Sequence, residues 1–223
     1  MFIGHMAAGF ASKRVAPQVS LGWLITAGML VDLLFPLFFL LGIEQVQSVP
    51  GSSPLTSMVF PFYPFTHSLA GSLGWALAFG ALYWLLKRDC RGSTVLSLVV
   101  LSHWLLDAIT HRPDMALYPG GPVVGLGLWN SVFGTVLVEG FLFLVALWLY
   151  VSATRAKDWI GVWALGALIA LLALLYWKHV AGPPPPSSKA MAWAGLLAWL
   201  FPLWAAWIDR HRQTARRIRR SEL

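Results

Sequence analysis

Three side chains of types that bind divalent metals recur at every fourth position of one apolar segment. They are His103, Asp107 and His111, within the run HWLLDAITH. In an α-helix this spacing places all three on one face, about one turn apart. Ionisable groups are costly within hydrocarbon, so their presence in an apolar helix indicates a function. The run therefore predicts a buried face that binds a metal ion.

Further groups of the same kind lie singly in other apolar segments: His5, Asp32, His67 and Glu139. At a rise of about 1.5 Å per residue, His5 lies roughly 12 Å into a membrane, and Asp32 and Glu139 lie near its middle. Pro36 cannot donate a hydrogen bond to the carbonyl of Asp32, which weakens the helix there and suits a residue that lines a cavity. We expect these groups to converge in the middle and outer half of one bundle.

Six apolar segments that are long enough to cross a membrane must position these residues. They cover residues 20–42, 67–87, 92–112, 127–152, 158–179 and 189–208, and residues 2–14 form a shorter stretch that reaches only the membrane centre. The chain is 58% hydrophobic and 11% charged. We predict an all-α, polytopic transmembrane helix bundle with one domain, residues 1–208, and a basic cytoplasmic tail, residues 209–223.

Basic residues are unequally distributed between the two ends of these segments. Three of the 16, Arg112, Lys178 and Lys189, fall on one side, and the others fall on the opposite side. The positive-inside rule places the more basic side, with both termini, in the cytoplasm, and predicts a multi-pass protein of the inner (plasma) membrane. The arginines between Arg210 and Arg220 follow the last span, where they mark a cytoplasmic end near anionic lipid. We expect no nucleic acid as a partner.

Some of the polar residues also have a purely structural explanation. Asp32 could form a hydrogen bond with a neighbouring helix, and Glu139 could be a protonated structural residue, a ligand or a general base. His111 directly precedes Arg112 and Pro113, where the helix should end, so a surface histidine fits as well as a ligand. These alternatives remain open at the level of the sequence.

Three residues near the outer end are candidate substrate contacts. Thr66 is expected to cap the helix that contains His67, and a helix N-terminus attracts anions such as phosphate. Arg112 is a cation at the same end, and Asn130 is a polar group at the start of a span. Asn130 would also fit a hydrogen bond between helices.

Four short motifs follow one another in the first half of the chain. They read Gly4-His5, Leu30-Val31-Asp32, Phe65-Thr66-His67-Ser68 and Ser102-His103-Trp104-Leu105-Leu106-Asp107. In type and order they resemble the motifs of the predicted membrane-bound, metal-dependent hydrolases (YdjM-like). That family is in turn similar to the zinc-dependent phospholipases C, which are all-α enzymes with metals held by His, Asp and Glu. The resemblance implies that His5, Asp32, His67, His103 and Asp107 are metal ligands.

The chain departs from many members of that family at two places. It has Leu34 and Phe35 where they carry a further Asp and His, and Phe62 and Tyr63 where they carry His and Arg. Fewer ligands are therefore available than in those relatives.

Together, the polar residues and the resemblance predict a metal-dependent hydrolase of a phosphoester, such as a phospholipid that enters from the bilayer. The expected metal is zinc, although manganese and iron suit the same ligands. Asp32 or Glu139 would accept the proton of a metal-activated water, and His111 or Arg112 would neutralise the phosphate or assist the leaving group.

Two other functions fit the same residues. A metal-ion or proton transporter would use them as a relay, but it would need polar groups along the whole path, and they gather in the outer half. A non-catalytic membrane protein would use a closed metal site to hold its helices together.

Overall fold

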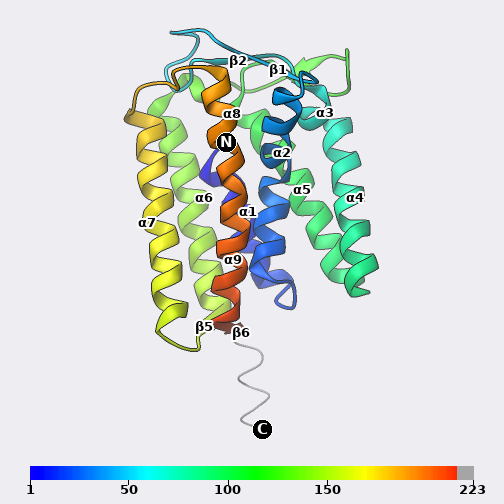
Figure 1. Cartoon of the computed structure of the whole chain (residues 1–223), viewed down its shortest axis with the longest axis vertical. Coiled ribbons are helices and arrows are strands. Elements are labelled where there is room, and N and C mark those ends of the chain that lie inside the picture. The colour runs from blue at the N-terminus through cyan, green and yellow to red at the C-terminus, as the bar shows by residue number, and fades with distance from the viewer. Residues whose placement is uncertain (215–223) are drawn as a thin grey trace.

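Long helices make up most of the structure, a computed structural model that describes residues 1–214. Six helical segments in this part of the chain are long and apolar enough to cross a membrane. They are α2 (Leu21–Leu40), α4 (Leu69–Lys87), α5 (Cys90–Thr110), α6 (Val132–Ala153), α7 (Trp159–Ala181) and the segment Ser188–Arg210, which comprises α8 (Ser188–Leu196), η2 (Leu197–Trp199) and α9 (Leu200–Arg210). They run side by side along the long axis (Figure 1). The chain is therefore a multi-pass membrane protein with the predicted all-α bundle.

The helix α6 starts later than the sequence predicted. It begins at Val132, after a 3-10 turn η1 (Leu128–Asn130), whereas the prediction began at residue 127. Gly127 adopts a left-handed conformation with φ +71°, which interrupts a helix. Ser131 then caps α6, because its Oγ accepts a hydrogen bond from the N–H of Gly134 at 3.0 Å.

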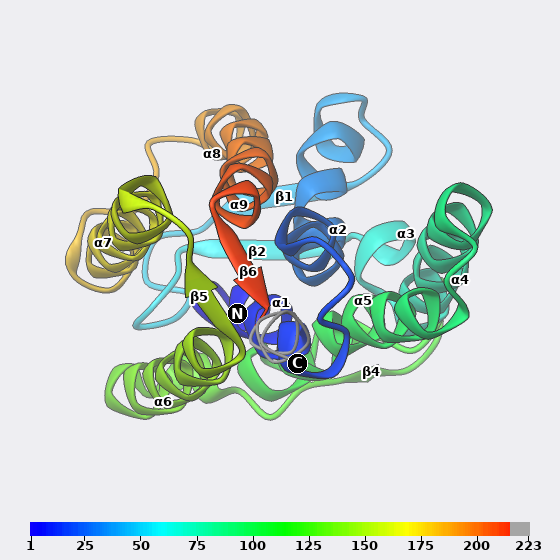
Figure 2. The same ribbon diagram turned by 90° about the horizontal axis from the view of Figure 1, so that it is seen from below.

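A shorter helix, α1 (Ile3–Val15), lies at the centre of the bundle and covers only half of its length (Figures 1 and 2). Its last turn carries Lys13, whose Nζ lies 2.8 Å from Asp209 Oδ1 near the end of α9. Its first turn lies inside the bundle, and Met1 is 5% exposed. The end of α1 that carries Lys13 lies at the same end of the bundle as the end of α9, and the side of the membrane on which the N-terminus lies stays a prediction.

Two glycines allow α1 to approach α2 closely. A Cβ on Gly28 would overlap the carbonyl oxygen of His5, and one on Gly9 would lie 2.8 Å from the carbonyl oxygen of Leu24. Small residues permit such close contact between membrane helices. This packing buries Met6 in the core and brings His5 against α2.

Two short antiparallel hairpins cover one end of the bundle, which we refer to as the hairpin end (Figure 1). β1 (Gln45–Ser48) pairs with β2 (Met58–Phe62), and β3 (Met115–Ala116) pairs with β4 (Val123–Val124). The one-turn helix α3 (Pro64–His67) links β2 to α4. A cluster of apolar side chains packs beneath the hairpins, comprising Phe35, Val46, Met58, Tyr63, Trp104 and Met115.

The opposite end, which we refer to as the basic end, carries the loops rich in Lys and Arg. Arg91 Nη2, at the start of α5, donates to the carbonyl of Val15 at 2.7 Å, which joins this helix to the end of α1. β5 (Thr154–Ala156) pairs with β6 (Arg212–Thr214). Residues 209–214 of the predicted tail are therefore folded against the bundle, and residues 215–223 lie outside the described residues.

Candidate metal centre

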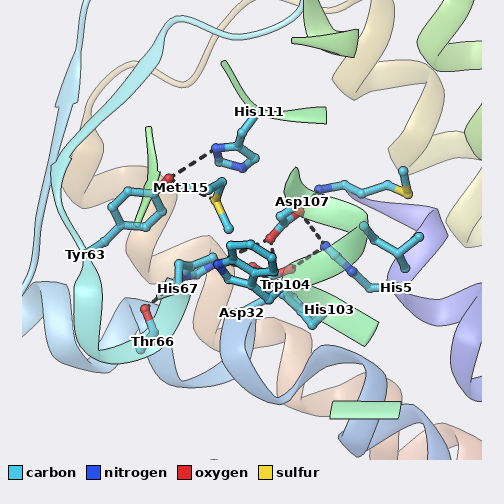
Figure 3. A network of polar contacts seen from close by, with 12 residues as sticks. His5, Asp32, Tyr63, Thr66, His67, His103, Trp104, Asp107, His111 and Met115 are labelled. Carbon is cyan, nitrogen blue, oxygen red and sulfur yellow. Dashed lines mark hydrogen bonds and ion pairs between the residues drawn. The ribbon is translucent and has the colours of Figure 1, made fainter. Parts of the chain in front are cut away.

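Five of the predicted residues meet in the half of the bundle near the hairpin end (Figure 3). His103 and Asp107 come from α5, one turn apart, and His5, Asp32 and His67 come from α1, α2 and α3. The side chains form two overlapping groups, His5–His103–Asp107 and Asp32–His67–His103, and within each group the possible ligand atoms lie within 4.8 Å of one another. We refer to these five residues as the centre.

The Nε2 atoms of the three histidines face the two carboxylates. His5 Nε2 lies 3.0 Å from Asp107 Oδ1, and His103 Nε2 lies 3.1 Å from Asp107 Oδ2. His67 Nε2 lies 3.4 Å from Asp32 Oδ1. Four segments that are distant in the sequence thus direct nitrogen and oxygen ligands to one small volume.

The orientation of His103 favours a cation at this point. Its Nδ1 lies 2.9 Å from the carbonyl oxygen of Gly28. Because a carbonyl only accepts hydrogen bonds, Nδ1 must carry the proton of a neutral ring. The lone pair of Nε2 then faces Asp107 Oδ2 and Asp32 Oδ1, at 3.1 and 3.6 Å. Nε2 is buried without a hydrogen-bond partner in residues 1–214. A proton or a metal ion must therefore lie between the ring and the carboxylates.

The ring of His5 lies parallel to that of His103, and this makes protons on both rings unfavourable. The ring centroids are 3.6 Å apart and the planes differ by 5°. Two positive charges at this distance repel each other by about 4 kcal/mol even at an effective dielectric constant of 20. A single divalent ion would satisfy both Nε2 atoms at once. Three imidazoles and two carboxylates form a donor set that suits zinc, manganese or iron, so the residues fit a metal.

The two carboxylates differ in accessibility. The side chain of Asp107 is 2% exposed, whereas that of Asp32 is 40% exposed. Asp107 Oδ1 also contacts the amine of Met1. Asp32 is therefore the more accessible of the two carboxylates of the centre.

The start of α4 differs from the prediction. Ser68, not Thr66, caps this helix, because Ser68 Oγ accepts from the N–H of Gly71 at 2.9 Å. Thr66 is fully buried in α3, and its hydroxyl lies 2.7 Å from His67 Nδ1. The burial and the hydrogen bonds of Thr66 direct its side chain toward the protein, and a substrate contact by this residue stays a prediction.

Glu44 is a buried residue of this region that the sequence analysis missed. Its Oε2 accepts the hydroxyl of Thr66 at 2.6 Å, and its Oε1 accepts the backbone N–H groups of Phe65 and Thr66 at 2.8 Å. Glu44 is 1% exposed. The sequence offered one sign that Glu44 is unusual: it is the one acidic residue between Asp32 and Asp89.

His111 lies beside the centre and not within it. Its Nδ1 is 3.0 Å from Asp114 Oδ1, and the hydroxyl of Tyr63 also donates to Asp114 Oδ1 at 3.0 Å. Burial lowers the pKa of His111 below its ordinary value, although the hydrogen bond to Asp114 opposes this shift. Burial raises the pKa of Tyr63, so its hydroxyl remains a donor. Burial therefore favours the uncharged form of His111.

A cavity of about 200 Å³ lies between the hairpins and the centre. Its lining includes Phe60, Tyr63, His67 and Asp114. The guanidinium of Arg112 lies near this group, with its Nε 3.6 Å from Asp114 Oδ2, and its side chain is 35% exposed. His67 is thus the residue of the centre that this cavity reaches.

Glu139 is fully buried in α6, and Asn130 lies directly before the start of that helix. Glu139 Oε2 accepts the N–H of Phe2 at 2.9 Å and that of Gly4 at 3.4 Å. These are free N–H groups at the start of α1, and a carboxylate there also interacts favourably with the helix dipole. Glu139 therefore anchors the buried end of α1 and belongs to neither ligand group found in residues 1–214. Asn130 is exposed in η1.

Comparisons of the chain with models of protein families, with characterised proteins and with solved structures found no match. The chemistry of the centre itself must therefore indicate the function.

Proposed function

We propose that this protein is a membrane-embedded, metal-dependent hydrolase of a phosphoester, with the centre as its metal site. The observation that carries the proposal is a buried ligand set with one accessible carboxylate, Asp32, which is 40% exposed. Structural metal sites are usually closed, whereas catalytic sites keep a position open for water or substrate. Zinc is the expected metal, and manganese and iron are compatible with the ligands.

The side chains around the centre have distinct roles in this proposal. A bound divalent metal would supply a water of lowered pKa and would polarise the phosphoryl oxygen. Asp32 accepts the proton of the attacking water, because it is the carboxylate that water can reach. Arg112 neutralises the phosphate, since it carries a permanent charge. His111, whose uncharged form is favoured by burial, contributes a hydrogen bond and no charge.

The position of the cavity supports a phospholipid as the substrate. The cavity opens between the hairpins at one end of the bundle and reaches His67. The basic loops lie at the other end, so the positive-inside rule puts the hairpin end on the non-cytoplasmic side. Phospholipid phosphates lie at the depth of such a bundle end, and His67 is the residue of the centre that lines the cavity there.

The packing beneath the centre favours a hydrolase over a transporter. Between the centre and the basic end, the side chains of Phe10, Leu24, Ile25 and Leu96 are fully buried. They belong to two apolar clusters of the bundle core. An ion that crossed the bundle would have to pass through this apolar layer, which is costly without polar groups.

The first experiment measures metal content and hydrolysis in detergent-purified protein. The test variant is His103→Ala with Asp107→Ala. The matched control is His211→Ala with Asp158→Ala, which removes another His–Asp pair, 2.7 Å apart at the basic end. We expect the wild type and the control to bind zinc or manganese and to release phosphorylated headgroup from phospholipid vesicles, and the test variant to do neither.

Two results would contradict the proposal. Wild-type protein without metal after supplementation would reject a metal-dependent reaction. Bound metal without hydrolysis of any phosphoester tested would reject the enzyme and favour a structural metal site.

A further inference from the structure

We propose that Glu44 and Thr66 are positioning residues that fix the neutral His67 ring in the form with its proton on Nδ1. In that form Nε2 presents its lone pair to the centre. The inference deepens the proposed function. It rests on that function in taking His67 as a metal ligand. It identifies two residues that act through His67 and do not touch the substrate themselves.

The direction of each hydrogen bond follows from its partners. Glu44 Oε1 accepts two backbone N–H groups, and Oε2 lies 2.6 Å from Thr66 Oγ1. A carboxylate can only accept, so the hydroxyl of Thr66 donates its proton to Glu44. Its oxygen is then an acceptor for His67 Nδ1, 2.7 Å away. The chain of bonds therefore places the proton of the ring on Nδ1, away from the centre.

Glu44 is the member that fixes the direction of the bond at Nδ1, whereas Nε2 lies 3.4 Å from Asp32 Oδ1 on the side of the centre. A hydroxyl alone can donate or accept, so Thr66 by itself would allow either protonated form of His67. His103 needs no such residue, because its Nδ1 faces the carbonyl of Gly28 directly. Residues that orient a metal-binding histidine commonly affect metal affinity by 10–100-fold.

The burial of Glu44 and Thr66 separates this role from substrate binding. Glu44 is 1% exposed and Thr66 is fully buried. The donors to Glu44 all come from residues 65 and 66, at the turn that carries His67. The hydrogen bonds of this carboxylate are thus concentrated on one histidine of the centre.

Glu44→Gln tests the inference because it reverses the chain of bonds. The amide oxygen would keep the two backbone N–H groups, so the amide NH₂ would face Thr66. The hydroxyl of Thr66 would then accept from Gln and donate to His67 Nδ1. This would move the ring proton to Nε2, which could no longer bind a metal.

Two substitutions of Thr66 and one control complete the series. Thr66→Val removes the hydroxyl, and Thr66→Ser retains it. Thr135→Val is the matched control, because Thr135 is another fully buried threonine whose hydroxyl bonds to backbone carbonyls of residues 128 and 131. If Glu44→Gln does not fold, Thr66→Val and Thr66→Ser still decide the result.

The first measurement is ¹⁵N NMR of histidine-labelled, metal-free protein at a pH where His67 is neutral, with His67→Gln to assign the signal. We expect the proton on Nδ1 in the wild type, Thr66→Ser and Thr135→Val. We expect it on Nε2 in Glu44→Gln, and on both nitrogens in exchange in Thr66→Val. A wild-type ring with its proton on Nε2, or no change in either Glu44→Gln or Thr66→Val, would overturn the inference.

The second measurement is zinc affinity by chelator competition, together with the Tm of the metal-free proteins. We expect a 10–100-fold loss for Glu44→Gln and Thr66→Val, and near-wild-type affinity for Thr66→Ser and Thr135→Val. A loss in Thr66→Ser equal to that in Thr66→Val would overturn the positioning role. The NMR result does not depend on metal, so an absence of hydrolysis would reject the proposed function alone.

Discussion

Both ends of the bundle bury charged side chains, but they balance those charges differently. At the basic end, Lys13 Nζ lies 2.8 Å from Asp209 Oδ1 and 2.8 Å from the carbonyl of Val19. Arg212, also buried there, donates to the hydroxyl of Thr154 and to the carbonyl of Gly161. Each buried cation thus has protein partners that satisfy it.

The centre near the hairpin end lacks this balance. Asp32 has no Lys or Arg within ion-pair distance in residues 1–214, and its neighbours there are the three histidines. Asp107 contacts the amine of Met1 besides the three histidines. Buried charges are normally paired or coordinate a metal. The difference indicates that the ion pairs of the basic end stabilise the fold, whereas the centre presents a donor set that fits a metal ion.

The largest expected effect comes from Asp107→Asn. Asp107 lies within 4 Å of all three Nε2 atoms, so its charge should be essential for holding a divalent ion. We expect the metal content and the proposed phosphoester hydrolysis to fall to background, as measured by elemental analysis and headgroup release. Metal retained at wild-type stoichiometry would remove Asp107 from the ligand set and weaken the contrast between the two ends.

The reciprocal change at the basic end is Asp209→Asn. It leaves Lys13, which is 3% exposed, without a charged partner, and breaking a buried pair in this way costs about 3 kcal/mol. We expect a lower unfolding free energy in denaturant titrations with the metal stoichiometry unchanged. The double variant Lys13→Met, Asp209→Leu should recover most of the stability. If metal content fell in Asp209→Asn under folding conditions, the two ends would not be independent.

Substitution of His111 should change how the stability of the protein depends on pH. Burial lowers the pKa of His111 in the folded protein below the ordinary value of 6.5, so the unfolded chain binds the proton more readily. The contribution of His111 to stability is complete above pH 6.5 and is lost as the pH falls from 6.5 through the pKa of the folded state. We expect metal-free His111→Gln to lose less stability than the wild type over this acidic range. Parallel curves for the two proteins would contradict this effect.

The spans and the pair on α5 were predictable because they depend on local properties. Apolar length defined the six spanning segments, and the helical repeat placed His103 and Asp107 on one face. The resemblance to a hydrolase family added His5, Asp32 and His67 to one ligand set, and the structure brings these five side chains together. Whether they bind a metal stays a prediction.

Three features of the structure depend on tertiary contacts that no local pattern in the sequence shows. Glu44 is 21 residues from Phe65, so nothing local indicates that it binds the turn before α4. Glu139 anchors the start of α1, more than 130 residues earlier, through Phe2 and Gly4. The pairing of β6 with β5 folds residues that composition alone described as a tail. Sequence patterns report burial and periodicity, whereas these roles depend on which segments the bundle brings together.

The smallest expected effect is that of substituting Asp89. This substitution is a second test of whether the basic end stabilises the fold and has no part in metal binding. The carboxylate of Asp89 caps α5 by accepting the N–H of Gly92, and it also accepts from Gln18, both at 3.0 Å. These bonds, the one from Gly92 first, lower the pKa of Asp89 below its ordinary value of 3.8. Asp89→Ala should cost about 1 kcal/mol of unfolding free energy at neutral pH, and Asp89→Asn should cost less, because Asn is also a good cap.

The sign of the pH dependence follows from that lowered pKa. The stabilisation by Asp89 is present above pH 3.8 and is lost as the pH falls through the pKa of the folded state. The difference in stability between the wild type and Asp89→Ala should therefore shrink in acid, as measured by denaturant titrations at several pH values. Metal binding should not change at neutral pH, since Asp89 lies at the far end of α5 from Asp107. A loss of metal in Asp89→Ala would show that the basic end also determines the geometry of the centre.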